Sequence, residues 1–449
     1  MFGQKVKHDY LILSYCWGDG NGPARTTQTN LEQRLQSGIV VNTLPQTVRD
    51  AIYLTRAVGV QYLWVDAICI IQSDKPTDPN EDWEAEALKM GAYYSKSLCC
   101  IYASHAYNSS TGFIFKNRRG FPWRPIYLQK PGSARRFVPR PDTGVIVIDV
   151  LKHPFYDQLD QLPIMKRAWC LQEWLLPIRK LHWTGESLFW ECRGVFGSPD
   201  TTPTLSDTRV TLHQLPLFSK PEGSQFPLGW FDMVPIYSSK ELTYETDRLA
   251  AVQGIADELC SKHNDQYFAG MFRSCVIQGL AWQRVRSNLD IRPNELFPSW
   301  SWASMPGIWY RWFSTHQKPV AKCIHFGPSV DSEGINDFDE GYKRSIGIDA
   351  PFLDLEVEPV KSSLDYYGQG PYGTIAYTSP NWSGAGIWVI PDVPGMPVDR
   401  LEVMILTRHP HISDPSSEEP NPEIGKVEYY GLVMQRLPEN QSQRVLHNT

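Results

Sequence analysis

The chain has 449 residues, of which 42% are hydrophobic and 20% are charged. This length supports two or three domains with cores of their own, and the composition excludes a disordered or fibrous chain. The formal net charge of −6 provides no overall positive field, so neither nucleic acid nor anionic lipid is an expected partner.

No segment is expected to cross a membrane or to direct the chain to secretion. The longest apolar stretch, residues 59–71, is too short to span a bilayer and contains Asp66. The N-terminal residues lack the apolar run of a signal peptide. The nine cysteines are odd in number and scattered, which favours buried free thiols over a disulfide framework. We therefore expect a cytoplasmic protein, and without a CxxC or HExxH motif no metal site is predicted.

Strand-like and helix-like segments alternate through the first 195 residues. Residues 9–15 form a short apolar run of strand type, which a glycine-rich loop follows. Residues 45–58 carry apolar side chains at helical spacing and start with Pro45, a residue that is favoured at the beginning of a helix. A second buried strand is predicted over residues 60–71.

The alternation continues further along the chain. Residues 81–97 have a helical apolar repeat, with acidic residues early and lysines late, as the helix dipole prefers. Residues 98–104 and 144–150 are predicted to be the third and fourth strands. A helix around Glu173 and a hairpin over residues 180–192 follow. This order predicts an α/β fold with a mostly parallel sheet, in which the functional crevice lies beyond the carboxyl ends of the strands.

The composition then changes. Residues 196–228 are rich in Pro, Thr, Ser and Gly and are predicted to be a linker. Residues 229–307 have a helical pattern and end in the motif SWSWAS. Residues 308–449 contain short β-like runs that are broken by Pro, Gly and acidic residues. The predicted organisation is an α/β domain over residues 1–195, this linker, a helical segment and a β-rich C-terminal region.

The loop after the first strand carries Gly18, Gly20 and Gly22. A dinucleotide-binding fingerprint requires a different spacing of its glycines and a helix that opens at once. Here the next predicted helix begins only near Pro45. A flexible loop that closes over a ligand is therefore favoured over a Rossmann site.

Polar residues occur at the end of the first predicted strand and within the second. Ser14 and Tyr15 end the first, and Asp66 lies in the second after Trp64 and Val65. Carboxylates at strand ends often hold ribose hydroxyls in α/β proteins. They also bind helix N-termini, and hydroxyl groups bond to nearby backbone. Ligand binding and local structure therefore both stay open for these residues.

Residues 167–176 read RAWCLQEWLL and place Glu173 among tryptophan and leucine residues. A carboxylate in such surroundings is costly unless it is paired or used. On a helix, Trp169 and Glu173 share one face, while a separate apolar stripe can pack on the sheet. Glu173 is thus predicted either to enter a crevice next to an indole ring or to form a salt bridge with Arg167 or Arg179.

Four segments, in this order, resemble the blocks of the fungal heterokaryon-incompatibility (HET) domain. They are YLILSYCWG, LPQTVRDAIYLTRAVGVQYLWVDAICIIQ, DWEAEALKMGAYYSKS and RAWCLQEWLLPIRKLHW. Two later segments, MVPIYSSKELTYETDRLAAVQGIA and FPSWSWAS, resemble the region that commonly follows this domain. The resemblance implies a protein of non-self recognition and programmed cell death in a filamentous fungus.

HET domains are regarded as distant relatives of TIR domains, which have a flavodoxin-like sheet and some of which cleave NAD. The resemblance therefore implies a flavodoxin/TIR-like fold and, as a hypothesis, an NAD glycohydrolase. In those TIR domains a glutamate in a WCLxE-like helix carries the activity, which assigns the catalytic role to Glu173. The predicted residues that bind NAD or a related nucleotide are Ser14, Tyr15, Trp17, Gly18, Asp66 and Trp169.

In this hypothesis NAD is the substrate and no cofactor is required. Cleavage of the bond between nicotinamide and ribose develops oxocarbenium character, which the carboxylate of Glu173 stabilises while it holds the ribose hydroxyls. A nearby indole ring stacks on the cationic pyridinium before cleavage.

Two other functions fit the same sequence. The domain can be a non-catalytic signalling module that forms a homo-oligomer or binds another HET protein, with Glu173 as an ion-pair residue. It can also be an enzyme of a secondary-metabolite pathway that uses the same crevice for another small molecule.

Overall fold

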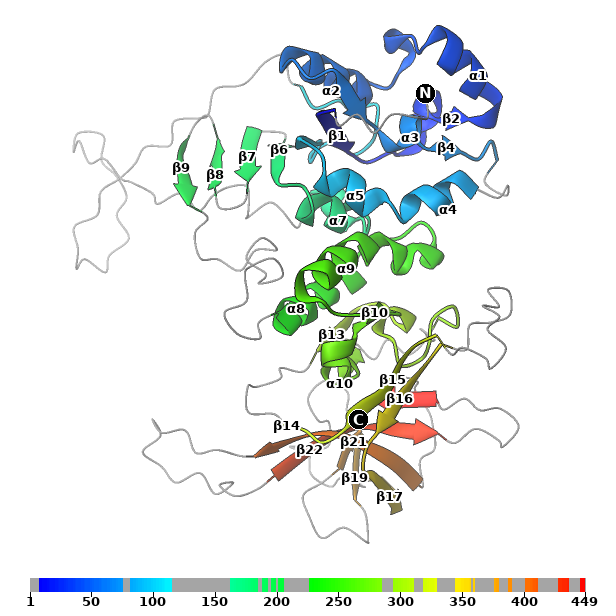
Figure 1. Cartoon of the computed structure of the whole chain (residues 1–449), viewed down its shortest axis with the longest axis vertical. Helices are drawn as coiled ribbons and strands as arrows, with labels where there is room; N and C mark the ends of the chain where they lie inside the picture. The colour runs from blue at the N-terminus through cyan, green and yellow to red at the C-terminus, as the bar shows by residue number, and fades with distance from the viewer. Residues whose placement is uncertain are drawn as a thin grey trace, which may run out of the picture. The chain divides into compact units, whose positions relative to one another are not determined.

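The computed structural model divides the chain into two compact units, Met1–Thr211 and Leu212–Thr449, which Figure 1 colours from blue to red along the chain. It describes residues 8–75, 81–114, 162–184, 188–192, 195–198, 201–205, 226–284, 294–310, 318–328, 344–356, 358–359, 375–378, 387–389, 400–410, 427–435 and 445–448. The predicted strand over residues 144–150 lies outside these ranges.

A seven-stranded sheet in the order β3-β1-β5-β6-β7-β8-β9 organises the first unit. Its strands are β1 (Tyr10–Ser14), β3 (Tyr62–Trp64), β5 (Cys99–Tyr102), β6 (Arg179–Trp183), β7 (Leu188–Cys192), β8 (Val195–Ser198) and β9 (Thr201–Leu205). The strands from β3 to β6 pair in parallel, and those from β6 to β9 pair antiparallel. In the parallel part, β1 lies between β3 and β5, the next two strands of this sheet along the chain. This is the flavodoxin-like strand order. The predicted α/β fold class is confirmed.

The sheet continues past the predicted end of the first domain. Strands β8 and β9 pair with each other and extend the sheet from β7 into the first part of residues 196–228, which the sequence pattern assigned to a linker. The antiparallel hairpin predicted over residues 180–192 is present as β6 and β7, with Trp183 opposite Leu188.

Short helices flank this sheet. They are α1 (Gln28–Ser37), α2 (Gln46–Ala57), α3 (Asp66–Cys69), α4 (Glu81–Ala87), α5 (Met90–Ser95) and α7 (Cys170–Leu175), with 3-10 helices η1 (Asp19–Ala24), η2 (Val41–Thr43) and η4 (Pro163–Lys166). The predicted helix over residues 45–58 is thus confirmed as α2. The helix predicted over residues 81–97 is split into α4 and α5 by a turn at residues 88–89.

The second predicted strand, over residues 60–71, is wrong beyond Trp64. Strand β3 has three residues, and the chain then forms α3 and the short strand β4 (Ile71–Gln72), which pairs with β2 (Thr26–Thr27). The carboxylate of Asp66 accepts a hydrogen bond from the backbone N–H of Ala67 at 2.7 Å and so supports the helical turn. An apolar run of this kind fits a buried helical turn as well as a strand, and periodicity does not separate them.

Both faces of the parallel strands are covered, so apolar side chains occur on both sides of each strand. On β1, Leu11 and Leu13 belong to the core that also contains Val48 and Ala51 of α2. Because neighbouring residues of a strand point to opposite faces, Ser14 points away from this core. Helix α2 lies on one side of the sheet, and α5 and α7 lie on the other (Figure 1).

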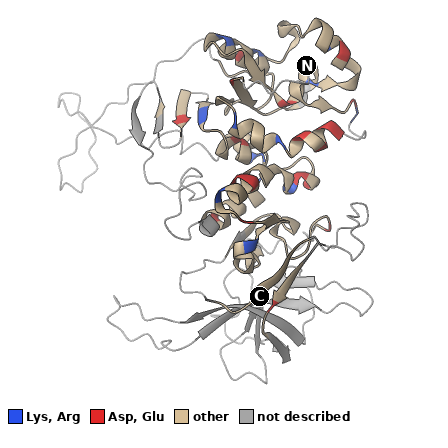
Figure 2. Cartoon of the chain, viewed as in Figure 1, with Lys and Arg blue, Asp and Glu red and all other residues tan. Residues whose placement is uncertain are grey.

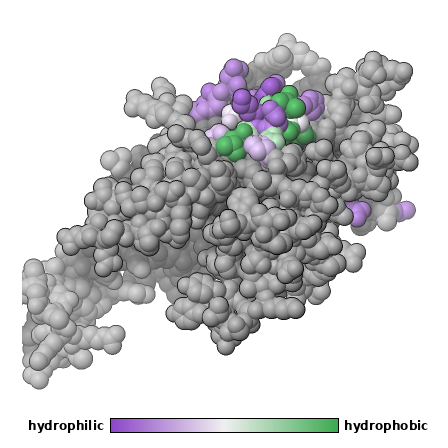
Figure 3. Space-filling view, turned by 90° about the horizontal axis from the view of Figure 1, so that it is seen from below, coloured by the Kyte–Doolittle hydropathy of each residue, from purple (hydrophilic) through white to green (hydrophobic). Residues whose placement is uncertain are grey.

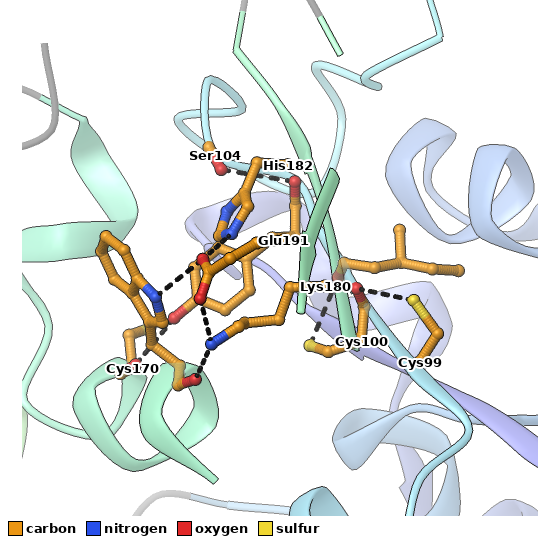
Figure 4. A network of polar contacts seen from close by, with 10 residues as sticks. Cys99, Cys100, Ser104, Cys170, Lys180, His182 and Glu191 are labelled. Atoms are coloured by element: carbon orange, nitrogen blue, oxygen red, sulfur yellow. Dashed lines mark hydrogen bonds and ion pairs between the residues drawn. The ribbon is translucent and has the colours of Figure 1, made fainter. Parts of the chain in front are cut away.

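A buried polar network attaches α7 to the sheet (Figure 4). The ammonium of Lys180 lies 2.7 Å from the carboxylate of Glu191 and donates to the carbonyl of Trp174 at 2.8 Å. Trp174 Nε1 donates to the other oxygen of Glu191 at 3.3 Å, and His182 Nε2 lies 3.0 Å from the same oxygen. Burial lowers the pKa of His182. The strands β6 and β7 therefore hold the C-terminal end of α7.

The described part of the second unit begins with the helices α8 (Phe226–Ser238), η6 (Glu245–Arg248) and α9 (Ala250–His263). The antiparallel strand pairs β10–β11 (Tyr267–Phe268, Met271–Phe272) and β12–β13 (Trp282–Arg284, Ile308–Tyr310) follow, with η7 (Arg273–Cys275), α10 (Val276–Gly279) and η8 (Trp302–Ser304). Ser301 and Trp302 of the SWSWAS motif donate to the carbonyls of Ala269 and Gly270, at 2.6 and 2.7 Å. The motif thus holds the β10–β11 turn.

Beyond residue 317 the described segments are strands. They are β14 (Lys318–Pro319), β15 (Lys322–Pro328), β16 (Arg344–Asp349), β17 (Phe352–Glu356), β18 (Glu358–Pro359), β19 (Ile375–Thr378), β20 (Ile387–Val389), β21 (Arg400–Pro410), β22 (Val427–Gln435) and β23 (Val445–Asn448). All their pairings are antiparallel. This part agrees with the predicted β-rich C-terminal region.

Charges of both signs are mixed over the described elements, with acidic residues gathered in the first turn of α4 (Figure 2). On the face seen in Figure 3, the described residues are hydrophilic and hydrophobic side by side. Within the described ranges, no helix is long and apolar enough to cross a membrane. Nor does any group of three His, Cys, Asp or Glu residues in these ranges have the arrangement of a metal site.

The network behind α7 leads to a stability prediction. In Glu191→Ala the buried ammonium of Lys180 loses its counter-charge, so the free energy of unfolding should fall by about 3–5 kcal/mol. Urea denaturation measures this change. The double variant Lys180→Met/Glu191→Leu removes both charges together and should recover most of the loss. A Glu191→Ala protein as stable as the wild type would show that the pair does not anchor the helix.

Candidate functional site

Three neighbouring parallel strands end at the same edge of the sheet. The register places Ser14, the last residue of β1, opposite Tyr102, the last residue of β5. The last residue of β3, Trp64, lies beside Ile12 on the other side of β1. The connection after β1 leads to β3 on one side, and the connection after β5 leads to β6 on the other side, so a topological switch point lies between β1 and β5. In open α/β sheets, ligands bind beyond the carboxyl ends of the strands at such a point.

Helix α7 brings Glu173 to this edge. The hydroxyl of Tyr102 donates to the carbonyl of Cys170 at 2.7 Å, which fixes the first turn of α7 against the end of β5. The hydroxyl of Ser14 donates to Glu173 Oε2, although 159 residues separate the two in sequence. Glu173 is 4% exposed and Ser14 is 1% exposed. The carboxyl group of Glu173 therefore lies buried at the carboxyl end of β1.

The surroundings of Glu173 change its ionisation. Burial raises the pKa of Glu173, while the positive charge of Arg167 and polar contacts from Ser14, Cys170 and Tyr94 act in the opposite direction. The salt bridge considered in the sequence analysis is not formed, since no ion pair within bonding distance among the described residues includes Glu173. Arg167 acts on this carboxyl from a longer distance.

Asp66 is the second carboxyl group at this edge. Its Oδ2 accepts a hydrogen bond from Trp17 Nε1 at 2.8 Å, and its Oδ1 accepts from the backbone of Ala67. Burial and the negative charge of Glu173 raise the pKa of Asp66 to about 7, against the opposite effect of Arg167. Both Asp66 and Trp17 keep intermediate exposure. The residue Asp66 is therefore partly exposed, while burial is the largest effect on its carboxyl group.

Arg167 supplies the positive charge of the site. One of its terminal nitrogens donates to the carbonyl of Tyr15 at 2.6 Å, so the guanidinium is held beside the residues that follow β1. Burial disfavours the charged form, but the neighbouring Cys170, Glu173, Cys16 and Asp66 raise the pKa of Arg167 overall. The guanidinium is therefore charged at any ordinary pH. Sequence reasoning considered Arg167 only as an ion-pair partner, and its sole signal was its place in the same block as Glu173.

Gly18 shapes the backbone next to Trp17. Its φ is +57° with ψ −167°, a conformation that side chains disfavour. A Cβ atom at this position would overlap the side chain of Asn108, and the carbonyl of Trp17 accepts from the backbone of Ser109 at 3.0 Å. The loop after β1 is therefore packed against the turn at residues 108–111. Its glycines Gly20 and Gly22 belong to the 3-10 helix η1 rather than to an open loop.

The two remaining predicted residues lie differently. Tyr15 is 2% exposed, and its side chain belongs to the core beneath α2. Tyr15 therefore contacts the site through its backbone carbonyl, which accepts the hydrogen bond from Arg167. Trp169 is 8% exposed, and its ring meets Trp83 of α4 edge-on at 5.4 Å. The structure thus gathers Ser14, Trp17, Asp66 and Glu173 at one edge, with Gly18 as backbone support.

The residues of this site fall within a recognised domain. The model of the heterokaryon incompatibility protein (HET) family matches residues 10–173, a range that begins with β1 and ends at Glu173. Residues 10–173 therefore form a domain of the HET family. No curated protein and no solved structure matches the chain.

The position of Gly18 gives a prediction with a matched control. Gly38 has nearly the same backbone conformation, φ +73° and ψ −167°, but open space around it. Gly38→Ala should therefore lose only the conformational cost, about 1–3 kcal/mol. Gly18→Ala adds the overlap with Asn108 and should lose clearly more in urea denaturation. Equal losses in the two variants would show that the packing against Asn108 is not tight.

The ionisation of Asp66 predicts a pH dependence of stability. Its folded pKa of about 7 lies above the ordinary value of 3.8, so the folded protein retains a proton that the unfolded chain releases. Stability should fall as the pH rises from about 4 to about 7. The melting temperature of Asp66→Asn, minus that of the wild type, should increase over this range. In the control Asp9→Asn, an exposed site, the difference should not change. A constant difference for Asp66→Asn would contradict the raised pKa.

Proposed function

We propose that the HET domain hydrolyses the bond between nicotinamide and ribose in NAD or a related nucleotide, with Glu173 as the catalytic residue. The proposal rests on the buried carboxyl group of Glu173, which Ser14 contacts at the topological switch point. In this function the protein acts in non-self recognition and programmed cell death, and the cleavage consumes the nucleotide.

The chemistry of the reaction suits this arrangement. Nicotinamide leaves as a neutral molecule, so the main requirement is to stabilise the positive charge that develops on the ribose. A carboxylate in surroundings of low dielectric exerts a strong field on such a charge. The ribose hydroxyls would replace the hydroxyl of Ser14 as donors to Glu173. Before the substrate binds, the hydrogen bond from Ser14 keeps the carboxylate of Glu173 oriented.

Other groups of the site match further parts of the substrate. The indole of Trp17 is partly exposed and lies next to Asp66, so we assign to it the stacking on the cationic pyridinium. The more buried Trp169 is packed against Trp83 and is less suited to this role. The guanidinium of Arg167 is the group that matches a phosphate of the nucleotide.

The proposal is tested with purified full-length protein and NAD, with free nicotinamide measured by chromatography. Glu173→Gln keeps the shape of the side chain but removes its negative charge, so kcat should fall about 100-fold or more. The matched control Glu84→Gln changes an exposed glutamate of α4 and should keep wild-type activity. Nicotinamide release by Glu173→Gln at the wild-type rate would refute the assignment.

A second candidate function, self-association without catalysis, is favoured by exposed apolar side chains in the first unit. Tyr53 and Val58, at α2, are 67% and 52% exposed, and Tyr62 on the edge strand β3 is 41% exposed. An exposed edge strand and apolar side chains near it are typical of association surfaces. In that function the wild type forms oligomers in size-exclusion chromatography and releases no nicotinamide. Stabilisation by another small molecule in a thermal-shift screen would instead indicate an enzyme with a different substrate.

A further inference from the structure

We infer that Asp66 is a second catalytic residue of this site, which takes a proton from the water molecule that attacks the ribose, while Glu173 stabilises the sugar. This inference rests on the proposed function and adds the residue that activates the nucleophile. The sequence pattern assigned Asp66 only to ligand binding or to local structure.

The two acidic residues differ in their exposure and in their contacts. Glu173 is 4% exposed, and the hydroxyl of Ser14 already occupies one of its oxygens. Asp66 begins α3, one residue after the end of β3, and as a residue keeps intermediate exposure, although burial raises the pKa of its carboxyl group. The more buried residue is therefore assigned to the sugar, and the more exposed one to the nucleophile.

Asp66 is also held in a fixed orientation. Each of its oxygens accepts one hydrogen bond, Oδ1 from the backbone of Ala67 at 2.7 Å and Oδ2 from Trp17 Nε1 at 2.8 Å. Each carboxylate oxygen has a further lone pair, so the group can still accept a proton. A fixed acceptor shortens the search for a productive geometry.

The electrostatic surroundings keep Asp66 close to the ionisation that a base needs at neutral pH. Burial and the charge of Glu173 favour its protonated form, and Arg167 favours its carboxylate form, which together give a pKa of about 7. A general base is most effective when its pKa lies near the working pH. In the part of the chain that the structure describes, the charge of Asp66 also acts on Tyr94 of α5 and Cys69 of α3.

The step balances without any further reactant. The bond between ribose C1′ and the pyridinium nitrogen breaks, and its electron pair stays on that nitrogen. The water oxygen forms the new bond to C1′, and one water proton moves to Asp66 and then to solvent. The products from NAD are nicotinamide, ADP-ribose and one proton, and no group is oxidised or reduced.

The test compares a nucleophile that must lose a proton with one that has none to lose. Water needs a base, whereas the ring nitrogen of a pyridine attacks with a free electron pair. Full-length protein is incubated with NAD and isotope-labelled nicotinamide, and both hydrolysis and the exchange of label into NAD are measured. In Asp66→Asn hydrolysis should fall about 100-fold, whereas exchange should change little. The control Asp9→Asn should leave both rates unchanged.

A second variant and a pH profile support the same test. Wild-type hydrolysis should rise through pH 7 as Asp66 loses its proton. Trp17→Phe keeps an aromatic ring but removes the hydrogen bond that favours the carboxylate, so this rise should move to higher pH. A profile unchanged in Trp17→Phe, or hydrolysis and exchange lost equally in Asp66→Asn, would overturn the role of Asp66.

The outcomes separate this inference from the proposed function. If the wild type releases no nicotinamide from NAD, the proposed function itself fails. If the wild type is active, Glu173→Gln is inactive and Asp66→Asn hydrolyses NAD normally, the proposed function stands and only the role of Asp66 is refuted.

Discussion

The burial of the Glu173 carboxyl group constrains the whole first unit. A carboxyl taken out of water is destabilising unless polar groups and a positive charge surround it. The fold provides these from separate elements: the hydroxyl of Ser14 at the end of β1, Tyr94 from α5, and Arg167 just before α7. The contacts of this one side chain therefore join β1, α5 and the segment that carries α7.

Helix α7 depends on these contacts as well. With six residues it is too short to be stable in isolation, so its conformation has to come from its neighbours. Tyr102 binds its first turn, and the network of Lys180, His182 and Glu191 holds its C-terminal end. Polar networks in a protein interior stabilise a structure only when their members are satisfied. The hydrogen bond from Tyr102 at one end and the network of Lys180, His182 and Glu191 at the other fix the helix that carries Glu173.

The site combines two carboxyl groups with different surroundings under the influence of one guanidinium. Glu173 is buried, whereas Asp66 is partly exposed and bound by two N–H groups. The charge of Glu173 disfavours the ionisation of Asp66, and Arg167 favours the charged form of both carboxyl groups. Pairs of titratable groups whose surroundings differ in this way are typical of acid–base sites. This is the physical basis on which distinct roles are assigned to the two residues.

Local pattern was sufficient to predict β1, α2, β5 and the β6–β7 hairpin, because each has a clear apolar period or turn signal. It placed Glu173 on a helix and Ser14 at a strand end, and the HET resemblance predicted that both line one crevice. The sequence by itself thus determined the fold class and the candidate residues. It did not determine the end of β3 at Trp64, since a short apolar run fits both a strand and a buried helical turn.

Only the tertiary structure decided how deeply each carboxyl is buried and which groups touch it. The partners of Glu173 include Ser14, 159 residues away, and those of Asp66 include Trp17, 49 residues away. Desolvation and charge act through space, so the ionisation of these groups follows from the packing of the sheet and its helices rather than from neighbours in sequence.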